Sequence, residues 1–282
     1  MTVLAVDVGG TKLSAGIVTD DGRLVERHDA PTPVGSGGDA MFDVLATLVS
    51  ALDRDGASLC GAGCGGPMDR GGDHVSPLNI PAWREFPLRS RLAELTGLPT
   101  FVDNDAKALA LGEGWTGAAA GCRDYIGMVV STGVGGGIVL DGRLLDGAGG
   151  NAGHIGHVIV EPDGHVCGCG ARGCLEAEAS GTAIARITGR PPKDAPLEVV
   201  ERTGTMIGRA VASIVNLLDL PLAVVAGSVA LGYGKPFFAA AQRELDASCR
   251  LDFSQGARIV PAKLGHDAPL IGAARVALTR SS

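Results

Sequence analysis

The sequence predicts an α/β fold. Three observations support this expectation. Strand-like apolar runs alternate with segments of helical spacing, a strand–glycine turn–strand unit occurs twice, around residues 9–12 and 132–137, and no linker or low-complexity tract interrupts the 282 residues. Alternation of strands with helices is typical of α/β architecture. The repeated unit also indicates an internal duplication.

Apolar spacing locates the elements of the first half. The expected strands are Val3–Val8, Leu13–Thr19, Leu24–Asp29, a buried run ending near Cys64, and Thr100–Val102. The expected helices are one that Asp39 caps and that carries Met41, Leu45, Leu48 and Leu52, a second at Leu88–Thr96, and a third at Asp105–Glu113 with Asp103 or Asn104 as its cap.

The second half begins near Trp115. Its expected strands are Tyr125–Ser131, Gly137–Leu140 and Leu222–Ala226, the last of which ends at Gly227-Ser228. Its expected helices are Glu198–Leu218 and Pro269–Leu278. Both halves therefore open with two strands joined by a glycine turn.

Composition argues against several classes of protein. The formal net charge of −7, from 24 basic and 31 acidic residues, disfavours nucleic-acid binding through phosphate contacts. No apolar run reaches the length of a membrane span, and Met1–Val8 lacks the basic start of a secretory signal. We therefore expect a cytoplasmic protein that binds neither nucleic acid nor membrane. Seven cysteines without such a signal favour reduced thiols and a metal site over disulfides.

The segment after the first strand is a tight glycine turn. It offers a phosphate two closely approaching backbone amides, a hydroxyl and a cation, from Gly9, Gly10, Thr11 and Lys12. Asp7 could hold Mg²⁺ or its waters. The turn is not a Walker A loop, because a strand follows it instead of a helix. An ordinary hairpin turn explains the segment equally well.

A second turn of this kind includes Thr132 and Gly133. It fails the dinucleotide pattern GxGxxG, because Ile138 occupies the last glycine position. Gly227 follows a strand and is a third candidate, although a plain strand-to-helix turn is the simpler interpretation there. Two such turns in two halves fit a nucleotide that is clamped by two lobes.

The pair Asn104-Asp105 stands where an apolar strand meets a helix. A carboxylate at a helix N-terminus is stabilised by the helix dipole and free N–H groups, so capping alone can explain Asp105. The catalytic alternative is that Asp105 accepts the proton of an attacking hydroxyl in phosphoryl transfer. Asn104 could then fix a neighbouring hydroxyl through its amide.

Cysteine spacing predicts a zinc site. His157 is followed by Cys167, Cys169 and Cys174 within Cys-Gly-Cys-Gly-Ala-Arg-Gly-Cys. Three thiolates and one imidazole form the closed tetrahedral set of a structural Zn²⁺ site. A disulfide between two of the cysteines, or three free thiols, are the alternatives. A closed site would make the metal a scaffold and would hold Glu176, two residues beyond the last ligand.

Taken together, these segments resemble the ROK family of sugar kinases and sugar-responsive repressors. The resemblance covers nearly the whole chain and rests on the ordered segments Asp7–Lys12, Gly66–Asp69, Asn79–Trp83, Asp103–Ala106, Thr132–Gly137, Ala152–His157 and Cys167–Glu176. It implies two ribonuclease-H-like lobes, of the actin-like ATPase and hexokinase type, with a cleft between them. The expected lobes are 1–115 with 267–282, to which the final helix returns, and 116–266 with a zinc loop at 157–176.

The resemblance implies an ATP-dependent kinase that phosphorylates the 6-hydroxyl of a hexose, with Asp105 as the general base. The residues that would line the sugar pocket are Gly66, Asn79, Asn104, Asp105, His154, His157 and Glu176. Those that would contact the phosphates or Mg²⁺ are Asp7, Gly9, Gly10, Thr11, Lys12, Thr132, Gly133 and Gly227. The other expected partners are further copies of the chain, in a homodimer or higher homo-oligomer.

The chain departs from the family pattern at His154, where a glutamate is usual, and at Gly65, Ala82 and Ser228. The glutamate reads ring hydroxyls, so His154 affects which sugar is expected, unless it only packs at the pocket rim. Glucose or a close relative is the first expectation. The alternative is a hexose changed at carbon 2 or 3, such as N-acetylmannosamine, glucosamine or kanosamine.

Two other functions compete with the kinase. Repressor members carry a helix-turn-helix before the first phosphate turn, and here that turn begins at Asp7, which leaves no room for one. A non-catalytic sugar-binding protein descended from a kinase is the second, and the intact Asp105 and both phosphate turns argue against it.

Overall fold

The computed structural model describes residues 1–33, 35 and 37–281. The chain forms two compact units. The first unit contains Met1–Thr116, Asp146–Ala152 and the C-terminal segment from Leu264, and the second contains Gly117–Leu145 and Gly153–Lys263. The short segment Asp146–Ala152 thus lies in the first unit, although the sequence prediction placed all of 116–266 in the second lobe.

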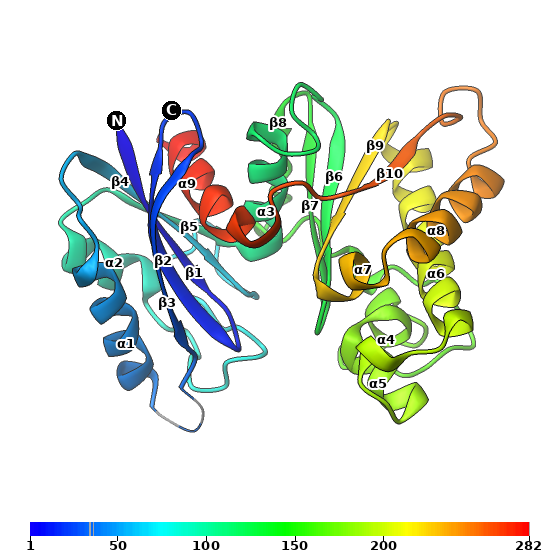
Figure 1. Cartoon of the computed structure of the whole chain (residues 1–282), viewed down its shortest axis with the longest axis horizontal. Coiled ribbons are helices and arrows are strands. Elements are labelled where there is room, and N and C mark those ends of the chain that lie inside the picture. Colours follow the sequence, from blue (N-terminus) through cyan, green and yellow to red (C-terminus); the bar gives the residue numbers. More distant parts are fainter. Residues whose placement is uncertain (34, 36, 282) are drawn as a thin grey trace. The chain divides into compact units, whose positions relative to one another are not determined.

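The sheet of the first unit has the strand order β3-β2-β1-β4-β5 (Figure 1). β1, β2 and β3 are antiparallel neighbours, whereas β1, β4 and β5 run parallel. The strands are β1 (Thr2–Val8), β2 (Lys12–Thr19), β3 (Leu24–Pro31), β4 (Ala57–Cys64) and β5 (Thr100–Asn104). The helices are α1 (Gly38–Ala51), α2 (Leu88–Thr96), α3 (Asp105–Trp115), η3 (Gly265–Asp267) and α9 (Ala268–Arg280).

Helices cover both faces of this sheet. Successive side chains of β1 point to opposite faces of the sheet, and those on both faces are apolar. Leu4 and Val6 pack in a core with side chains of α1 and α2, while Val3 and Ala5 pack against α9. The final helix therefore returns to the first unit, as the resemblance implied. Burial on both faces explains why β1 reads as a continuous apolar run.

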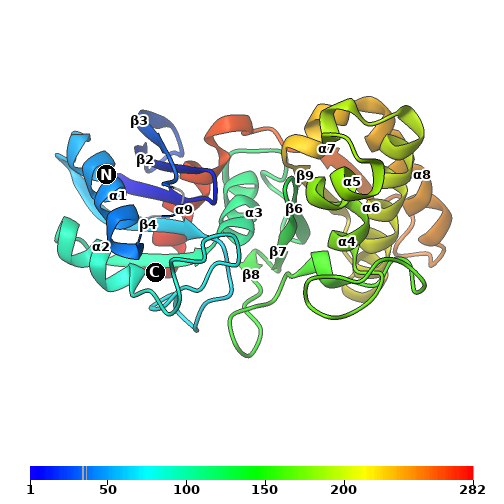
Figure 2. The same ribbon diagram turned by 90° about the horizontal axis from the view of Figure 1, so that it is seen from below.

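The sheet of the second unit has the order β8-β7-β6-β9-β10, which repeats the topology of the first. The strands are β6 (Tyr125–Val130), β7 (Val134–Leu140), β8 (Arg143–Leu144), β9 (Leu222–Ala226) and β10 (Arg258–Pro261). The helices are η1 (Ile155–His157), α4 (Leu175–Ala179), α5 (Gly181–Thr188), η2 (Pro192–Asp194), α6 (Leu197–Leu218), α7 (Ser228–Tyr233) and α8 (Lys235–Ser248). α6 and α8 lie side by side (Figure 2), and a Cβ at Gly204 of α6 would lie 2.4 Å from the Phe237 carbonyl oxygen. The shared topology agrees with an internal duplication.

Two local predictions were wrong. Asp39 does not cap α1, since Gly37 is the N-cap and Asp39 lies in the first turn, where it pairs with Arg91. β7 begins at Val134 instead of Gly137, so most of the predicted glycine turn is strand. Asn104 caps α3 as predicted. Within the described residues, no helix combines the length and apolarity needed to cross a membrane.

Candidate active site

Two carboxylates lie at the carboxyl edge of the parallel strands in the first unit. Asp7 stands at the end of β1 and Asp105 directly follows β5, with β4 between these strands. A Cβ at Gly63 of β4 would lie 3.6 Å from the Asp7 Oδ1 atom and 3.6 Å from the Asp105 Cα atom. The missing side chain at Gly63 therefore leaves the two acidic residues near each other, at the edge where α/β proteins bind their ligands.

Burial, and after it the negative charge of Asp105, raises the pKa of Asp7 to about 7. Lys12 and Arg27 act in the opposite direction but are the weaker influences. A divalent cation beside the two carboxylates would favour the ionised form of Asp7 and offset their repulsion. The donor set therefore fits Mg²⁺, which prefers carboxylate oxygens and water.

The start of α3 fixes the Asn104-Asp105 pair. The Asn104 Oδ1 atom accepts a hydrogen bond from the backbone nitrogen of Ala106 at 3.0 Å, and the Asp105 Oδ1 atom accepts from the same nitrogen at 2.8 Å. The amide group of Asn104 keeps its NH₂ as a donor for a ligand. Free N–H groups at this helix end favour the ionised form of a carboxylate, which is the form that a general base requires.

The first glycine turn adjoins the loop that carries Asn79. A Cβ at Gly10 would lie 2.7 Å from the Asn79 Nδ2 atom, and the carbonyl oxygen of Gly66 accepts from Leu78, the residue before Asn79, at 3.2 Å. At Gly9 a Cβ would lie 2.9 Å from the Lys12 carbonyl oxygen, so the turn needs glycine there. The structure thus brings the predicted phosphate turn and two predicted sugar residues together within the first unit.

Lys12 forms an ion pair with Asp29 in the protein itself. Its Nζ atom lies 3.7 Å from the Asp29 Oδ1 atom, and its side chain is about one-third exposed. Asp29 also pairs with Arg27 at 2.9 Å. Because Asp29 already has this second cation, Lys12 can turn toward an added anion without leaving Asp29 unpaired.

In the second unit, the turn after β6 is bound from two sides. The Glu176 Oε2 atom accepts from the backbone nitrogen of Val134 at 2.9 Å. Thr182 donates to the Thr132 carbonyl oxygen from its backbone nitrogen at 3.2 Å and from its hydroxyl at 2.9 Å. Glu176, predicted for the sugar side, therefore also shapes the turn that contains Gly133. The sequence analysis missed Thr182, because no local pattern marks it.

Gly227 lies beside the same turn. Its φ of +100° is a conformation that favours glycine, and a Cβ there would lie 2.2 Å from the Val130 carbonyl oxygen. The next residue, Ser228, places its hydroxyl 2.9 Å from that of Ser131. The ends of β6 and β9 thus meet at the predicted nucleotide side, and the two serines add hydroxyls that the sequence analysis did not assign.

The segment that carries His154 and His157 lies flat on β7. A Cβ at Gly153 would lie 2.4 Å from the Gly136 carbonyl oxygen, and one at Gly156 would lie 2.3 Å from the Val134 carbonyl oxygen. This close approach explains the glycine-rich sequence of β7. The rings of His154 and His157 are nearly parallel, with centroids 6.2 Å apart. His154 is exposed, so its ring is accessible to a ligand.

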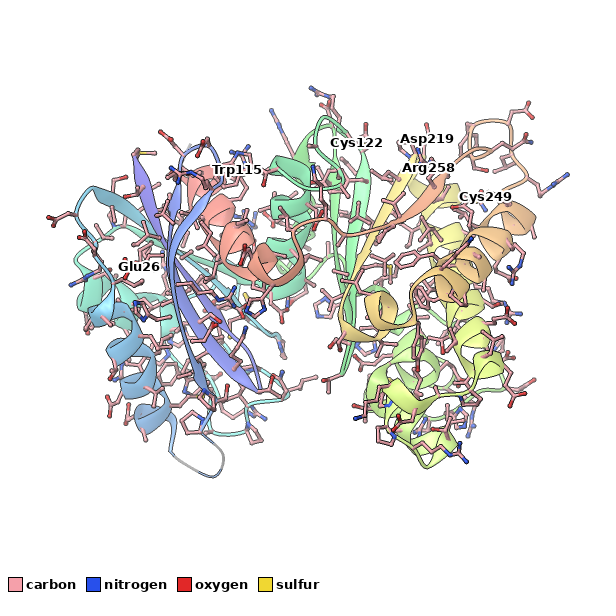
Figure 3. All side chains as sticks on the ribbon, viewed as in Figure 1. Glu26, Trp115, Cys122, Asp219, Cys249 and Arg258 are labelled. Carbon is pink, nitrogen blue, oxygen red and sulfur yellow. The ribbon has the colours of Figure 1, made fainter. Side chains whose placement is uncertain are left out.

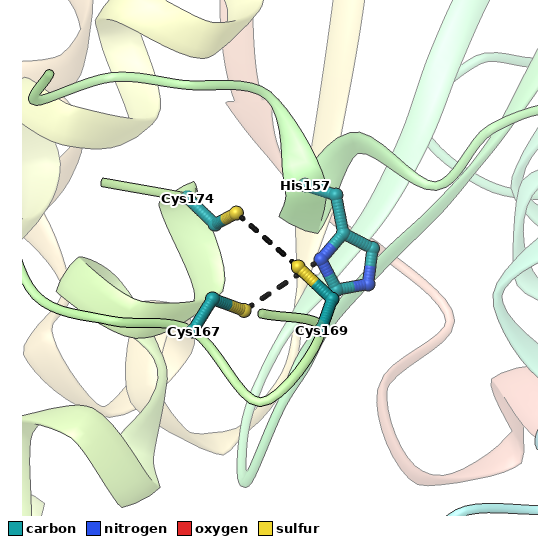
Figure 4. A group of neighbouring side chains, drawn as sticks. All are labelled: His157, Cys167, Cys169 and Cys174. Carbon is teal, nitrogen blue, oxygen red and sulfur yellow. Dashed lines mark hydrogen bonds between the residues drawn. The ribbon is translucent and has the colours of Figure 1, made fainter. Parts of the chain in front are cut away.

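The predicted zinc residues form one cluster. One donor atom from each of His157, Cys167, Cys169 and Cys174 lies within 4.8 Å of all the others. Figure 4 shows the His157 Nδ1 atom turned toward the sulfur atoms, 3.8 Å from the Cys167 Sγ atom. The Cys169 and Cys174 Sγ atoms are 3.7 Å apart, so these cysteines are free thiols and form no disulfide. The donor set fits a tetrahedral Zn²⁺ ion, and the Nε2 atom of His157 remains available on the opposite side of the ring.

Buried charge supports the loop between these ligands. The side chain of Glu178 is fully buried and accepts from the His165 backbone nitrogen at 2.6 Å and from Arg202 of α6 at 2.6 Å. Burial acts to raise the pKa of Glu178, but these bonds together outweigh it and lower the pKa below its ordinary value. These bonds attach the part of the loop around His165 to α6. The sequence analysis did not single out Glu178, because an isolated glutamate reads as a surface residue.

The chain belongs to the ROK family, whose model matches residues 3–280. It is 37% identical to the N-acetylmannosamine kinase of Escherichia fergusonii over 295 residues, which cover 98% of this chain and 98% of that protein. The relatives so named include that of Citrobacter koseri, also 37% identical over 98% of this chain and 99% of that protein.

Solved structures of sugar kinases share the fold. A ROK hexokinase from Thermus thermophilus is 36% identical, with a TM-score of 0.84 over 100% of this chain and 99% of that chain. A ROK family glucokinase from Streptomyces griseus, in complex with glucose and AMPPNP, is 29% identical, with a TM-score of 0.84 over 99% of this chain and 100% of that chain. These matches confirm the predicted α/β fold of the hexokinase and actin-like ATPase type.

Proposed function

We propose that the protein is an ATP-dependent kinase for a hexose modified at carbon 2, with N-acetylmannosamine as the first substrate to test. The observation that carries this proposal is the 37% identity to N-acetylmannosamine kinases over nearly the full length of both chains. Glucose was the first expectation from the sequence. The curated relatives support the modified-hexose alternative better, and the glucokinase with bound glucose is less similar, at 29% identity.

Asp105 is proposed as the general base that accepts the proton of the sugar 6-hydroxyl. Asp105 lies in the first turn of α3, and it stands near Asp7, a candidate Mg²⁺ ligand. A bound Mg²⁺ ion would neutralise charge on the transferred phosphate. Asp7 would hold that ion or its waters, and the buried strand β1 keeps this carboxylate in a fixed place.

The residues proposed to bind sugar are Gly66, Asn79 and Asn104 in the first unit, and His154, His157 and Glu176 in the second. Their chemistry suits hydroxyls, because they combine backbone, amide, imidazole and carboxylate groups. His154 has one donor and one acceptor when its ring is neutral, whereas a glutamate would accept bonds from two adjacent hydroxyls. Histidine therefore fits a sugar that carries something other than a free hydroxyl at one of those positions.

The residues proposed to bind the nucleotide phosphates are Gly9, Gly10, Thr11 and Lys12 in the first unit, and Thr132, Gly133 and Gly227 in the second. Both groups sit in turns where a glycine lets backbone amides approach a ligand. Zn²⁺ on the histidine and three cysteines is proposed to hold the loop before α4. It would thereby fix the position of Glu176, and it would take no part in phosphoryl transfer.

The proposed reaction is tested by identifying its product. Purified protein, ATP, Mg²⁺ and N-acetylmannosamine should yield ADP and a sugar phosphate whose phosphorus couples to the carbon 6 protons in NMR. Asp105→Asn protein, run in parallel, controls for contaminating kinases. ADP formation without a phosphorylated sugar, or phosphate at another carbon, contradicts the proposed reaction.

A further inference from the structure

Helix α3 carries two buried charged residues that the proposed chemistry does not use. The side chain of Lys107 is 2% exposed, and Glu113 is 0% exposed. Charged side chains are rarely buried so completely unless they are paired, because losing their hydration costs several kcal/mol. The contacts of these two residues therefore indicate what they do.

Lys107 binds the segment Asp146–Ala152, which belongs to the first unit although the residues before and after it belong to the second. Its Nζ atom donates to the Asp146 Oδ1 atom at 3.1 Å and to the Gly150 carbonyl oxygen at 2.7 Å, and it lies 3.6 Å from the Asp103 Oδ1 atom. Lys107 thus makes two hydrogen bonds and one further ion-pair contact. The segment Asp146–Ala152 is thus attached to α3 at Lys107, which lies two residues after Asp105 in the sequence.

Arg280 of α9 completes this network. It donates to the Asp103 Oδ2 atom at 2.7 Å and to the Asp146 Oδ2 atom at 2.7 Å. Its bonds to Asp146, with help from Lys107, lower the pKa of that carboxyl to about 2. Asp146 is therefore ionised at any physiological pH.

The attached segment has residues of the second unit on both sides. Leu145 donates from its backbone to Ile138 of β7 at 2.8 Å, and Gly153 packs on Gly136 of the same strand. The chain therefore leaves β8 and passes through Asp146–Ala152, where Asp146 and Gly150 bond to Lys107 of α3. It returns to β7 directly before His154. One residue, Gly153, separates Ala152 from His154, so the Cα atoms of Ala152 and His154 lie at most about 7 Å apart.

Glu113 holds a second returning segment on the same helix. Its Oε1 atom accepts from the backbone nitrogen of Leu264, where the chain re-enters the first unit, at 3.0 Å. The helix itself packs closely on α9, because a Cβ at Gly112 would lie 3.1 Å from the Gly272 Cα atom. Trp115, labelled in Figure 3, ends α3, and the guanidinium of Arg275 from α9 lies 5.1 Å from its ring centroid.

We propose that Lys107 and Glu113 are positioning residues, which anchor both returning segments on the helix that begins with Asp105. The Lys107 anchor holds the segment that is followed directly by Gly153 and His154, the second of which is proposed to bind the sugar. Both side chains are buried and bond to protein groups, so neither is proposed to be catalytic. A buried ion set adds little stability compared with packed apolar residues, whereas its directed bonds fix one arrangement. The kinetic part of this proposal rests on the proposed kinase function.

Lys107→Met tests the anchor, because it keeps most of the length and volume of the side chain and removes the charge. We expect the KM for the sugar to rise about tenfold or more while kcat stays within about threefold, since Asp105 is untouched. Lys107→Arg should recover part of the loss by keeping a cation. Asp146→Asn should act in the same direction, and the double variant should lose less than the sum of the two changes.

Val49→Ala is the matched control for lost stability. Val49 is a fully buried residue of α1 in the core of the first unit, far in the chain from α3 and from both returning segments. This change should lower the melting temperature by forming a cavity and leave the sugar KM unchanged. If Lys107→Met also lowers the melting temperature without changing the KM, the residue is merely structural and the proposal is overturned.

Hydrogen exchange tests the anchors without any assumption about substrate. The amide of Ala152 donates to the Asp146 carbonyl oxygen at 2.9 Å, and that of Leu264 donates to Glu113. Exchange should accelerate at Ala152 in Lys107→Met, at Leu264 in Glu113→Leu, and at neither in Val49→Ala. Exchange that matches the control contradicts the anchors. A wild-type protein that phosphorylates no hexose contradicts the proposed function only, and the exchange result still decides the anchors.

Discussion

The carboxylate of Glu176 accepts a 2.9 Å hydrogen bond from the backbone nitrogen of Val134. This bond joins the end of the cysteine loop to the glycine turn after β6, although 42 residues separate the two in sequence. Glu176 follows Cys174 by two residues, so whatever fixes Cys174 also fixes this carboxylate. The metal cluster is therefore connected to the candidate phosphate turn through Glu176.

This link makes a prediction for the metal. Protein purified without chelator should contain one Zn²⁺ per chain, and its removal should lower activity by about tenfold or more by releasing Glu176 and the turn. Elemental analysis of wild-type and Cys167→Ser protein measures the metal. Cys122→Ser, outside the cluster, should keep its zinc. Metal-free wild-type protein, or a disulfide within the cluster, would show that the site is not a zinc site.

The position of Asp105 predicts that replacing it lowers kcat and leaves the affinities for sugar and ATP nearly unchanged. Asp105→Asn keeps the size and polarity of the side chain but removes the base, so kcat should fall by at least about a hundredfold. Calorimetric titration should show sugar and ATP affinities within a few-fold of the wild type. Asp141→Asn changes an exposed aspartate of the β7–β8 turn and should leave kcat unchanged. Near-normal kcat in Asp105→Asn would remove the residue from its proposed role.

The raised pKa of Asp7 predicts a pH-dependent stability in magnesium-free buffer. The pKa rises from 3.8 to about 7 in the folded protein, so between these values the folded state holds a proton that the unfolded state has lost. The contribution of Asp7 is therefore fully present below about pH 4 and is lost as the pH rises to about 7, by at most about 1.4 kcal/mol per pH unit.

Urea unfolding of wild-type and Asp7→Asn protein across this range measures the effect. The wild-type free energy of unfolding should fall relative to the variant between about pH 4.5 and 7, and the difference should be constant above about pH 8. A difference that does not change with pH shows that Asp7 is already ionised in the folded protein.

His154 predicts a change of substrate ranking. His154→Glu restores an acceptor for two neighbouring hydroxyls, so kcat/KM should rise for glucose and fall for N-acetylmannosamine, by about tenfold in their ratio. His74→Glu, on an exposed loop residue of the first unit that lies outside the proposed site, should leave the ratio unchanged. An unchanged ratio in His154→Glu means that the ring only packs at the rim.

Much of the framework could be predicted from local patterns. The bounds of α2 and β9 match the prediction, because Gly97 adopts the left-handed conformation that ends a helix and β9 is a buried apolar run with a glycine after it. The metal cluster was also foreseen, since its ligands are close in sequence. These features depend on short-range spacing, which a sequence displays directly.

Features that depend on tertiary contacts were missed. Lys107 reads as a surface residue of a helix, and only the distant partners Asp146 and Gly150 explain its burial. β10 was not predicted, because its four residues show no clear alternation and it is a strand only through its pairing with β9. The early start of β7 likewise follows from the segment that packs on its glycines.

The ranking of substrates tests the central claim most directly. The kcat/KM values should be measured with ATP and Mg²⁺ for N-acetylmannosamine, glucose, N-acetylglucosamine, glucosamine and kanosamine, with Asp105→Asn as the blank. We predict that N-acetylmannosamine is phosphorylated with the highest kcat/KM, by about tenfold or more over glucose. Glucose as the best substrate would contradict the modified-hexose proposal, and no phosphorylation of any of the five sugars would contradict a hexose kinase.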